Sequence, residues 1–145
     1  MAIKGKYRPK RTSKYKGDPT TIIYRSLWER KFMQYCDNNP NIIEWSSEEI
    51  FVWYKSPIDN RPHRYFPDFY IKYKEISGKT KKMIIEVKPE KQTKPPSRSK
   101  LKPKSYLRES FEFAKNQAKW KAMNEWCLDR KYEFKILTEN DLGIK

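Results

Sequence analysis

The sequence predicts an α/β or α+β domain in which helices cover a small mixed sheet. Its 145 residues match one ordinary domain, and 15% aromatic residues can fill a core although 35% of residues are charged. Its local patterns run helix, three strands, helix, strand. That order favours a single sheet flanked by helices over an all-helical or all-strand architecture.

The chain is predicted to open with a basic N-terminal arm at residues 1–20, followed by a single domain at residues 21–145. The first twenty residues are polar and are interrupted by Pro9, Gly17 and Pro19. Residues 1–17 hold no acid and seven basic side chains: Lys4, Lys6, Arg8, Lys10, Arg11, Lys14 and Lys16.

The first helix is predicted to begin at Ser26. Glu29 follows three residues later, which is the spacing of a capping box. The expected buried stripe is Trp28, Phe32 and Tyr35, and Asn38-Asn39-Pro40 is expected to end the helix.

Extended chain follows, because residues 42–54 (IIEWSSEEIFVWY) are rich in β-branched and aromatic residues. Residues 57–62 are expected to form a loop. Residues 64–74 and 82–88 flank Ser77-Gly78, which predicts a hairpin with a short loop.

Residues 89–105 are predicted to form a mobile loop, rich in Pro, Ser and Lys, that ends the hairpin's second strand at Pro89. The stretch from 91 to 105 again contains no acid. Its six basic residues are Lys91, Lys94, Arg98, Lys100, Lys102 and Lys104.

The second helix is predicted at residues 106–130, and residues 132–137 (YEFKIL) are predicted to form a last short strand. The helix is expected to bury a stripe made of Leu107, Phe111, Ala114 and Ala118.

The two acid-free runs carry 13 of the 15 net positive charges. Such concentration suits a polyanionic partner, because neutralising phosphates releases condensed counterions. A solvated tail and a solvated loop are the alternative for either run alone. Two separate runs favour nucleic acid.

Several classes of protein are excluded. Two cysteines, Cys36 and Cys127, fit a reducing compartment rather than a disulfide framework. With His63 as the one histidine, zinc fingers and nuclease centres built from several imidazoles lack ligands. No apolar run approaches the roughly 18 residues of a membrane span, and the opening residues lack the apolar stretch of a secretory signal.

The hairpin predicts a site. If its loop is centred on Ser77, Asp68 lies directly across from Glu86. Because strand side chains alternate, one face carries the core residues Phe69, Ile71, Met83, Ile85 and Val87. The other face carries Asp68, Tyr70, Ile84, Glu86 and Lys88.

Two carboxylates opposed across a sheet destabilise it unless a cation lies between them. Mg²⁺ commonly uses one or two carboxylates together with substrate phosphate. The alternative is that Asp68 and Glu86 are solvent-facing residues paired with Lys72 or Lys82.

Pro67-Asp68 with Glu86-Val87-Lys88 resembles the signature of the PD-(D/E)XK nucleases, and the predicted element order resembles their restriction-endonuclease-like αβββαβ core. The chain also resembles the head completion nucleases of T-even-type tailed phages and, more distantly, the TnsA-type transposon nucleases. That likeness covers residues 20–140 and rests on Tyr24-Arg25-Ser26 with Glu29, Asn39-Pro40, Trp45, Ser47-Glu48, HRYFPDFYI and IIEVKP.

This resemblance implies hydrolysis of DNA phosphodiesters with Mg²⁺ or Mn²⁺. Asp68 and Glu86 would hold the metal, helped by the Val87 carbonyl, while Lys88 would orient a water or stabilise developing charge. Glu29 matches an acidic residue that many relatives place on the first helix to complete the metal site; its alternative is the capping box. Endonuclease and exonuclease action both remain open.

Double-stranded or branched DNA is the expected partner, held through its phosphates by the two basic runs with little base specificity. Phage head or portal proteins are further expected partners, and the host cytoplasm during infection is the expected location, with possible retention in the virion. The alternatives are a recombination endonuclease of TnsA type and a non-catalytic DNA-binding or head-plugging protein. Glu48, His63, Gln117 and Lys119 are expected to lie at the surface. The alternatives are that His63 contacts a phosphate or substrate, and that Gln117 or Lys119 is the auxiliary polar residue that some relatives place on the second helix.

Overall fold

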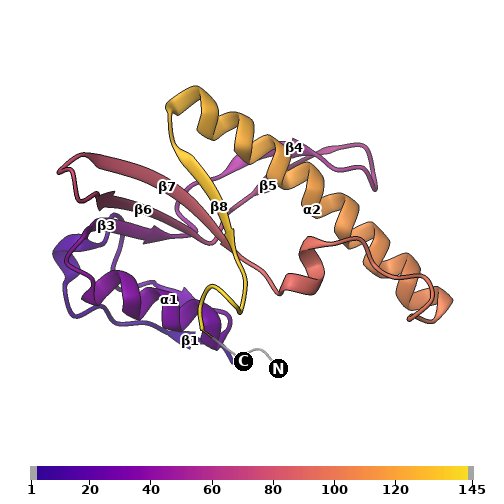
Figure 1. Ribbon diagram of the computed structural model, residues 1–145, viewed down its shortest axis with the longest axis horizontal. Coiled ribbons are helices and arrows are strands. Elements are labelled where there is room, and N and C mark those ends of the chain that lie inside the picture. The colour runs from indigo at the N-terminus through magenta and orange to yellow at the C-terminus, as the bar shows by residue number, and fades with distance from the viewer. Residues whose placement is uncertain (1–2, 144–145) are drawn as a thin grey trace.

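A computed structural model describes residues 3–143, and its central feature is a four-stranded mixed sheet between two helices (Figure 1). The strand order is β3-β6-β7-β8, with β8 parallel to β7 and the other neighbours antiparallel. The predicted αβββαβ order is confirmed, with an extra two-stranded hairpin inserted between β3 and β6. The core elements are α1 (Leu27–Asn38), β3 (Ile42–Ser47), β6 (Phe69–Lys74), β7 (Thr80–Val87), α2 (Pro103–Arg130) and β8 (Glu133–Leu137).

Helix α1 begins at Ser26 as predicted, because the Ser26 hydroxyl accepts a hydrogen bond from the Glu29 backbone N–H (3.2 Å). The predicted stripe was wrong at Tyr35, which is exposed, and Trp28 is only partly buried. The face that packs on the sheet is Glu29, Phe32, Met33, Cys36 and Asp37. Two of these are acids, so a search for apolar side chains alone selects the wrong face.

The extended chain predicted at 42–54 divides into β3 and β4 (Val52–Lys55). The break falls at Glu48, whose φ of 53° no strand residue adopts. The run at 64–74 likewise divides into β5 (Pro62–Tyr65) and β6. Strands β4 and β5 pair with each other and leave the main sheet.

The β6–β7 hairpin has the predicted register. Phe69 pairs with Ile85 and Lys74 with Thr80, so the loop centre falls at residue 77. The predicted core face is confirmed, since Phe69, Ile71 and Ile85 lie in the cluster beneath α1.

The opposite face of the sheet is also buried. Tyr70 and Ile84 pack there with Trp120, Met123 and Cys127 of α2. The face that carries Glu86 is therefore covered by a helix, and Glu86 is buried rather than exposed to solvent.

Helix α2 starts at Pro103, three residues before its predicted start. Its predicted stripe was wrong at Leu107 and Phe111, which are exposed, whereas Ala118 packs against the core. Figure 1 shows the first half of α2 running past the sheet, where it has no core to contact. The residues it buries come later in the helix: Asn116, Trp120, Met123 and Cys127.

The predicted N-terminal arm is corrected: residues 3–20 pack against the domain. Strand β1 (Gly5–Lys6) pairs with β2 (Ile23–Tyr24), and a 3₁₀ turn, η1, follows at Thr12–Lys14. Tyr15 is buried in the core beneath α1. Tyr15, an aromatic residue inside the basic run, thus anchors the N-terminal segment to the core.

Residues 89–102 contain a short 3₁₀ turn, η2 (Glu90–Thr93), and are otherwise irregular, as predicted. Among the described helices, none combines the length and apolar character of a membrane span.

Candidate active site

Asp68, Glu86 and Lys88 meet where β6 begins and β7 ends. The Val87 backbone N–H donates a hydrogen bond of 2.7 Å to Asp68 Oδ2. Glu86 is 4% exposed, and Lys88 Nζ lies 3.9 Å from Glu86 Oε2. The predicted cross-strand arrangement therefore exists, and Asp68 is held in place by the backbone of the facing strand.

Burial strongly affects the Asp68 carboxyl. It raises the pKa of Asp68 well above its ordinary value, and the negative charges of Glu86 and Glu29 raise it further. The hydrogen bond from Val87 acts in the opposite direction. The buried Glu86 carboxylate and the half-buried Asp68 carboxylate thus share one small region, and a positive charge between them would relieve their repulsion.

Tyr65 and Trp120 line the site from β5 and α2, and sequence reasoning assigned neither to it. Burial raises the pKa of the Tyr65 hydroxyl, and Glu86 and Asp68 raise it further, which places this hydroxyl beside both acids. Within the described part of the chain, Tyr65 Oη and Trp120 Nε1 are buried without a hydrogen-bond partner. Tyr65 could not be assigned to the site from the sequence, because the chain breaks at residues 66–68 and the alternation of strand side chains does not continue across that break.

Lys119 adds a second lysine to the site. It was expected at the surface, but it is half-buried with Nζ 5.6 Å from the ring centre of Tyr65 and 5.8 Å from that of Tyr54. Burial lowers the pKa of Lys119, and so does the nearby charge of Lys88. Gln117 is exposed as expected.

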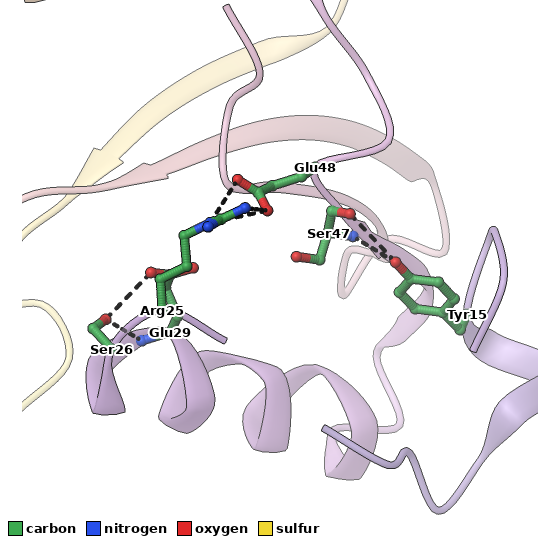
Figure 2. Close-up of polar contacts among 6 residues, drawn as sticks. All are labelled: Tyr15, Arg25, Ser26, Glu29, Ser47 and Glu48. Carbon is green, nitrogen blue, oxygen red and sulfur yellow. Dashed lines mark hydrogen bonds and ion pairs between the residues drawn. The ribbon is translucent and has the colours of Figure 1, made fainter. Parts of the chain in front are cut away.

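Glu29 lies in the first turn of α1 beside the capping residue Ser26 (Figure 2), and its charge acts on Asp68. It is 8% exposed, and Oε1 has no hydrogen-bond partner among the described residues. Burial raises the pKa of Glu29, and Glu48 raises it further. Across residues 3–143, no three His, Cys, Asp or Glu side chains form a metal-binding cluster, and the role of Glu29 as a metal ligand stays a prediction.

An ion pair borders the α1 side of the site (Figure 2). Arg25 Nη2 lies 3.2 Å from Glu48 Oε2, and the Glu48 backbone N–H donates to the Asp68 carbonyl (3.1 Å). The charge of Glu48 raises the pKa of Arg25. Tyr15 supports the same turn, because its hydroxyl accepts from the Ser47 N–H (3.1 Å). Glu48 is thus a partner of Arg25, and its left-handed backbone turns the chain toward β4.

His63 pairs with Tyr54 in the inserted hairpin and is itself exposed, with Nε2 2.7 Å from Asp59 Oδ2. The expectation that it lies at the surface is confirmed.

The donor set fits a hard divalent cation. Asp68 and Glu86 present two carboxylates at adjacent strand positions, and the cation nearest Glu86 is a lysine at 3.9 Å. Mg²⁺ and Mn²⁺ accept such oxygen ligands and fill the remaining positions with water and phosphate.

The basic residues predicted to bind DNA divide into two groups. All six in the loop are exposed. In the N-terminal run, Lys14 is half-buried, and Lys14 and Arg11 donate hydrogen bonds to the end of α1. The other five in that run are exposed: Lys4, Lys6, Arg8, Lys10 and Lys16.

Comparison with known proteins supplies the family. The TnsA-like endonuclease N-terminal family matches residues 39–139, more than half of the chain. The chain belongs to the TnsA-like endonuclease family. It is therefore a nuclease of PD-(D/E)XK type, and the matched residues include Asp68, Glu86 and Lys88.

A curated relative extends the likeness to nearly the whole chain. The head completion nuclease of Enterobacteria phage T4 is 39% identical over 146 residues, covering 98% of this chain and 95% of the relative. Glu29 lies outside the residues matched by the family but within the length shared with this relative. No solved structure matches the chain.

Proposed function

We propose that this nuclease hydrolyses DNA phosphodiesters with Mg²⁺ or Mn²⁺ at Asp68, Glu86 and Lys88, and acts on packaged DNA during phage head completion. The observation that carries the proposal is the pairing of the buried Glu86 carboxylate with the half-buried Asp68 carboxylate, with a lysine 3.9 Å from Glu86. The phage setting is inferred from the T4 relative, whose name is head completion nuclease.

Asp68 and Glu86 would hold the metal, with the Val87 carbonyl as a further ligand. When bound, the metal supplies a Lewis acid for the phosphate and lowers the pKa of a water. Glu29 would complete the metal site from α1, which is supported by its burial and by its negative charge raising the pKa of Asp68.

The chain's own residues prepare the reaction. The Val87 N–H fixes the rotamer of Asp68, so that carboxyl needs no rearrangement before it acts. Lys88 carries a positive charge toward the same region, where it orients the attacking water or stabilises charge on the phosphate. Burial by α2 keeps these interactions strong by excluding solvent.

DNA is proposed to be held through its phosphates. The six exposed basic residues of the 91–104 loop and the exposed lysines and arginine near the N-terminus supply charge without a groove-reading motif. Double-stranded and branched DNA both suit such contacts. Head or portal proteins as partners, and the host cytoplasm as location, follow from the phage setting.

Cleavage of supercoiled plasmid tests the proposal directly. We expect nicking with Mg²⁺ and none with EDTA, and we expect Asp68→Ala and Lys88→Ala each to lower the rate at least about a hundredfold. Asp129→Ala is the matched control, because Asp129 is exposed on α2. Equal activity in Asp68→Ala and the intact protein would place the chemistry elsewhere.

A further inference from the structure

The inserted hairpin, β4 (Val52–Lys55) with β5 (Pro62–Tyr65), has two different faces. Val52, Tyr54 and Tyr65 point inward and pack in the cluster beneath α2. Because side chains alternate along a strand, the residues between them point the other way. Trp53 pairs with Arg64, and the positions next to this pair, Phe51 and Phe66, extend the same outward face.

This outward face gathers three exposed aromatic rings around one guanidinium. Trp53 is 61% exposed, Phe51 41% and Phe66 40%. The Phe51 ring lies 5.3 Å from that of Phe66 and 6.0 Å from that of Trp53. The Arg64 guanidinium lies 5.7 Å from the ring centres of both phenylalanines.

The backbone of the aromatic face is close to that of the proposed catalytic carboxylates. Phe66 is two residues from Asp68 along the chain, so their Cα atoms are at most about 7 Å apart. Phe51 is three residues from Glu48, whose backbone N–H bonds the Asp68 carbonyl. A molecule lying on these rings is therefore within about one or two nucleotide lengths of the site.

We propose that Phe51, Trp53, Arg64 and Phe66 form a stacking surface for unpaired nucleotides of the DNA substrate, so that a single-stranded tail or flap is drawn to the active site. This inference rests on the proposed function and names its substrate class. Exposed rings next to an arginine bind single strands by stacking bases while the guanidinium contacts phosphate. Paired bases inside a duplex do not offer their faces to such rings.

Two features of the hairpin favour a nucleic acid over a protein as the occupant. Between residues 51 and 66 the single acid is Asp59, which is paired with His63 at the far turn, whereas Lys55, Arg61 and Arg64 are basic. A polyanion suits that balance. The surface also borders the catalytic carboxylates, where a bound protein would block substrate.

Binding measurements without metal test the inference separately from cleavage. Fluorescence anisotropy in EDTA would compare a blunt duplex with the same duplex carrying a short unpaired tail. We expect the wild type to bind the tailed duplex more tightly than the blunt one. In the double variant Trp53→Ala/Phe66→Ala, the ratio of these two affinities should fall at least about tenfold. Trp53→Phe should retain it, and Ile76→Ala, at an exposed site on the β6–β7 loop, should leave it unchanged.

The outcomes distinguish the inference from the proposed function. Equal affinity of the wild type for both duplexes would overturn it, even if plasmid cleavage depends on Asp68. So would a double variant that keeps the full preference, a result that would leave the face as a protein contact. Tail preference in a protein that cleaves nothing would support the stacking surface and overturn the nuclease instead. The melting temperature of each variant should match that of the wild type, because the substituted rings are exposed. A match shows that the loss of tail preference is local.

Discussion

Two basic runs that look alike in sequence have different fates in the structure. Residues 4–16 and 91–104 are both dense in Lys and Arg and free of acids. The first is anchored to the domain through its backbone and the side chains of Arg11 and Lys14, although its other basic side chains are exposed, while the second leaves all six basic side chains exposed. The comparison teaches that charge density alone does not say whether the partner of a cation lies inside the protein or outside it.

Asp37 anchors the first run. It is 1% exposed at the end of α1 and accepts hydrogen bonds from the Lys10 N–H (2.7 Å), the Arg11 N–H (3.0 Å) and the Tyr7 hydroxyl (3.0 Å). Two of these donors are backbone groups. One buried acid, 26 to 30 residues away in sequence, therefore holds the backbone of the basic segment in place.

Lys14 adds a second anchor. Its Nζ donates to the carbonyls of Cys36 (2.7 Å) and Asn39 (2.9 Å), at the end of α1 where carbonyls lack helical partners. By contrast, the ion pair in the 91–104 loop joins Lys94 to Glu90 at 3.4 Å between largely exposed side chains, and contributes little.

The largest expected effect comes from Asp37→Ala. Removing the acceptor leaves three partly buried donors unpaired and frees the N-terminal run, so we expect the free energy of unfolding to fall by about 3 kcal/mol. Urea denaturation measures it. Asp129→Ala is the exposed control and should change stability by less than about 0.5 kcal/mol. A small loss in Asp37→Ala would mean that the first run is as loosely held as the second.

An intermediate effect is expected from neutralising the loop with Lys94→Gln, Arg98→Gln and Lys100→Gln together. Each lost phosphate contact should reduce the slope of log affinity against log salt by about 0.9, and affinity for DNA at low salt should fall with it. Stability should not change. The measurement is a salt titration of duplex binding in EDTA, and an unchanged slope would remove the loop from the DNA interface.

The smallest effect is expected from Lys14→Gln, which should lower stability by about 1 kcal/mol and leave the salt slope unchanged. Burial lowers the pKa of Lys14, so its charge costs free energy in the folded protein. The stability of the wild type relative to Lys14→Gln should therefore increase as pH rises through the folded pKa toward that of the unfolded chain. Urea midpoints at neutral and alkaline pH measure this. A decrease with rising pH would mean that the ammonium is stabilised rather than penalised.

The local sequence pattern was sufficient to predict structure where the interacting residues are close along the chain. The hairpin centred on residue 77 placed Asp68 across from Glu86, because a short loop sets the register and the alternation of side chains sets the face. The start of α1 was equally predictable, since Ser26 caps the first turn through a contact only three residues long.

Local pattern failed where a distant segment supplies the partner. Tyr35, Leu107 and Phe111 have the spacing of buried stripes but are exposed, because no element packs over them. Tyr65 and Lys119 reach the site from an inserted hairpin and from α2, fifty-four residues apart in the chain. Their proximity depends on how α2 crosses the sheet.

By itself, the sequence determined the order of elements, the register of the central hairpin and the pairing of two carboxylates with a lysine, all of which follow from short-range backbone geometry. Only the tertiary structure decided that the face carrying Glu86 is buried, that one basic run is tied to Asp37 and that aromatic rings collect beside Asp68. Burial and long-range hydrogen bonds depend on which surfaces meet, and no spacing along the chain encodes that.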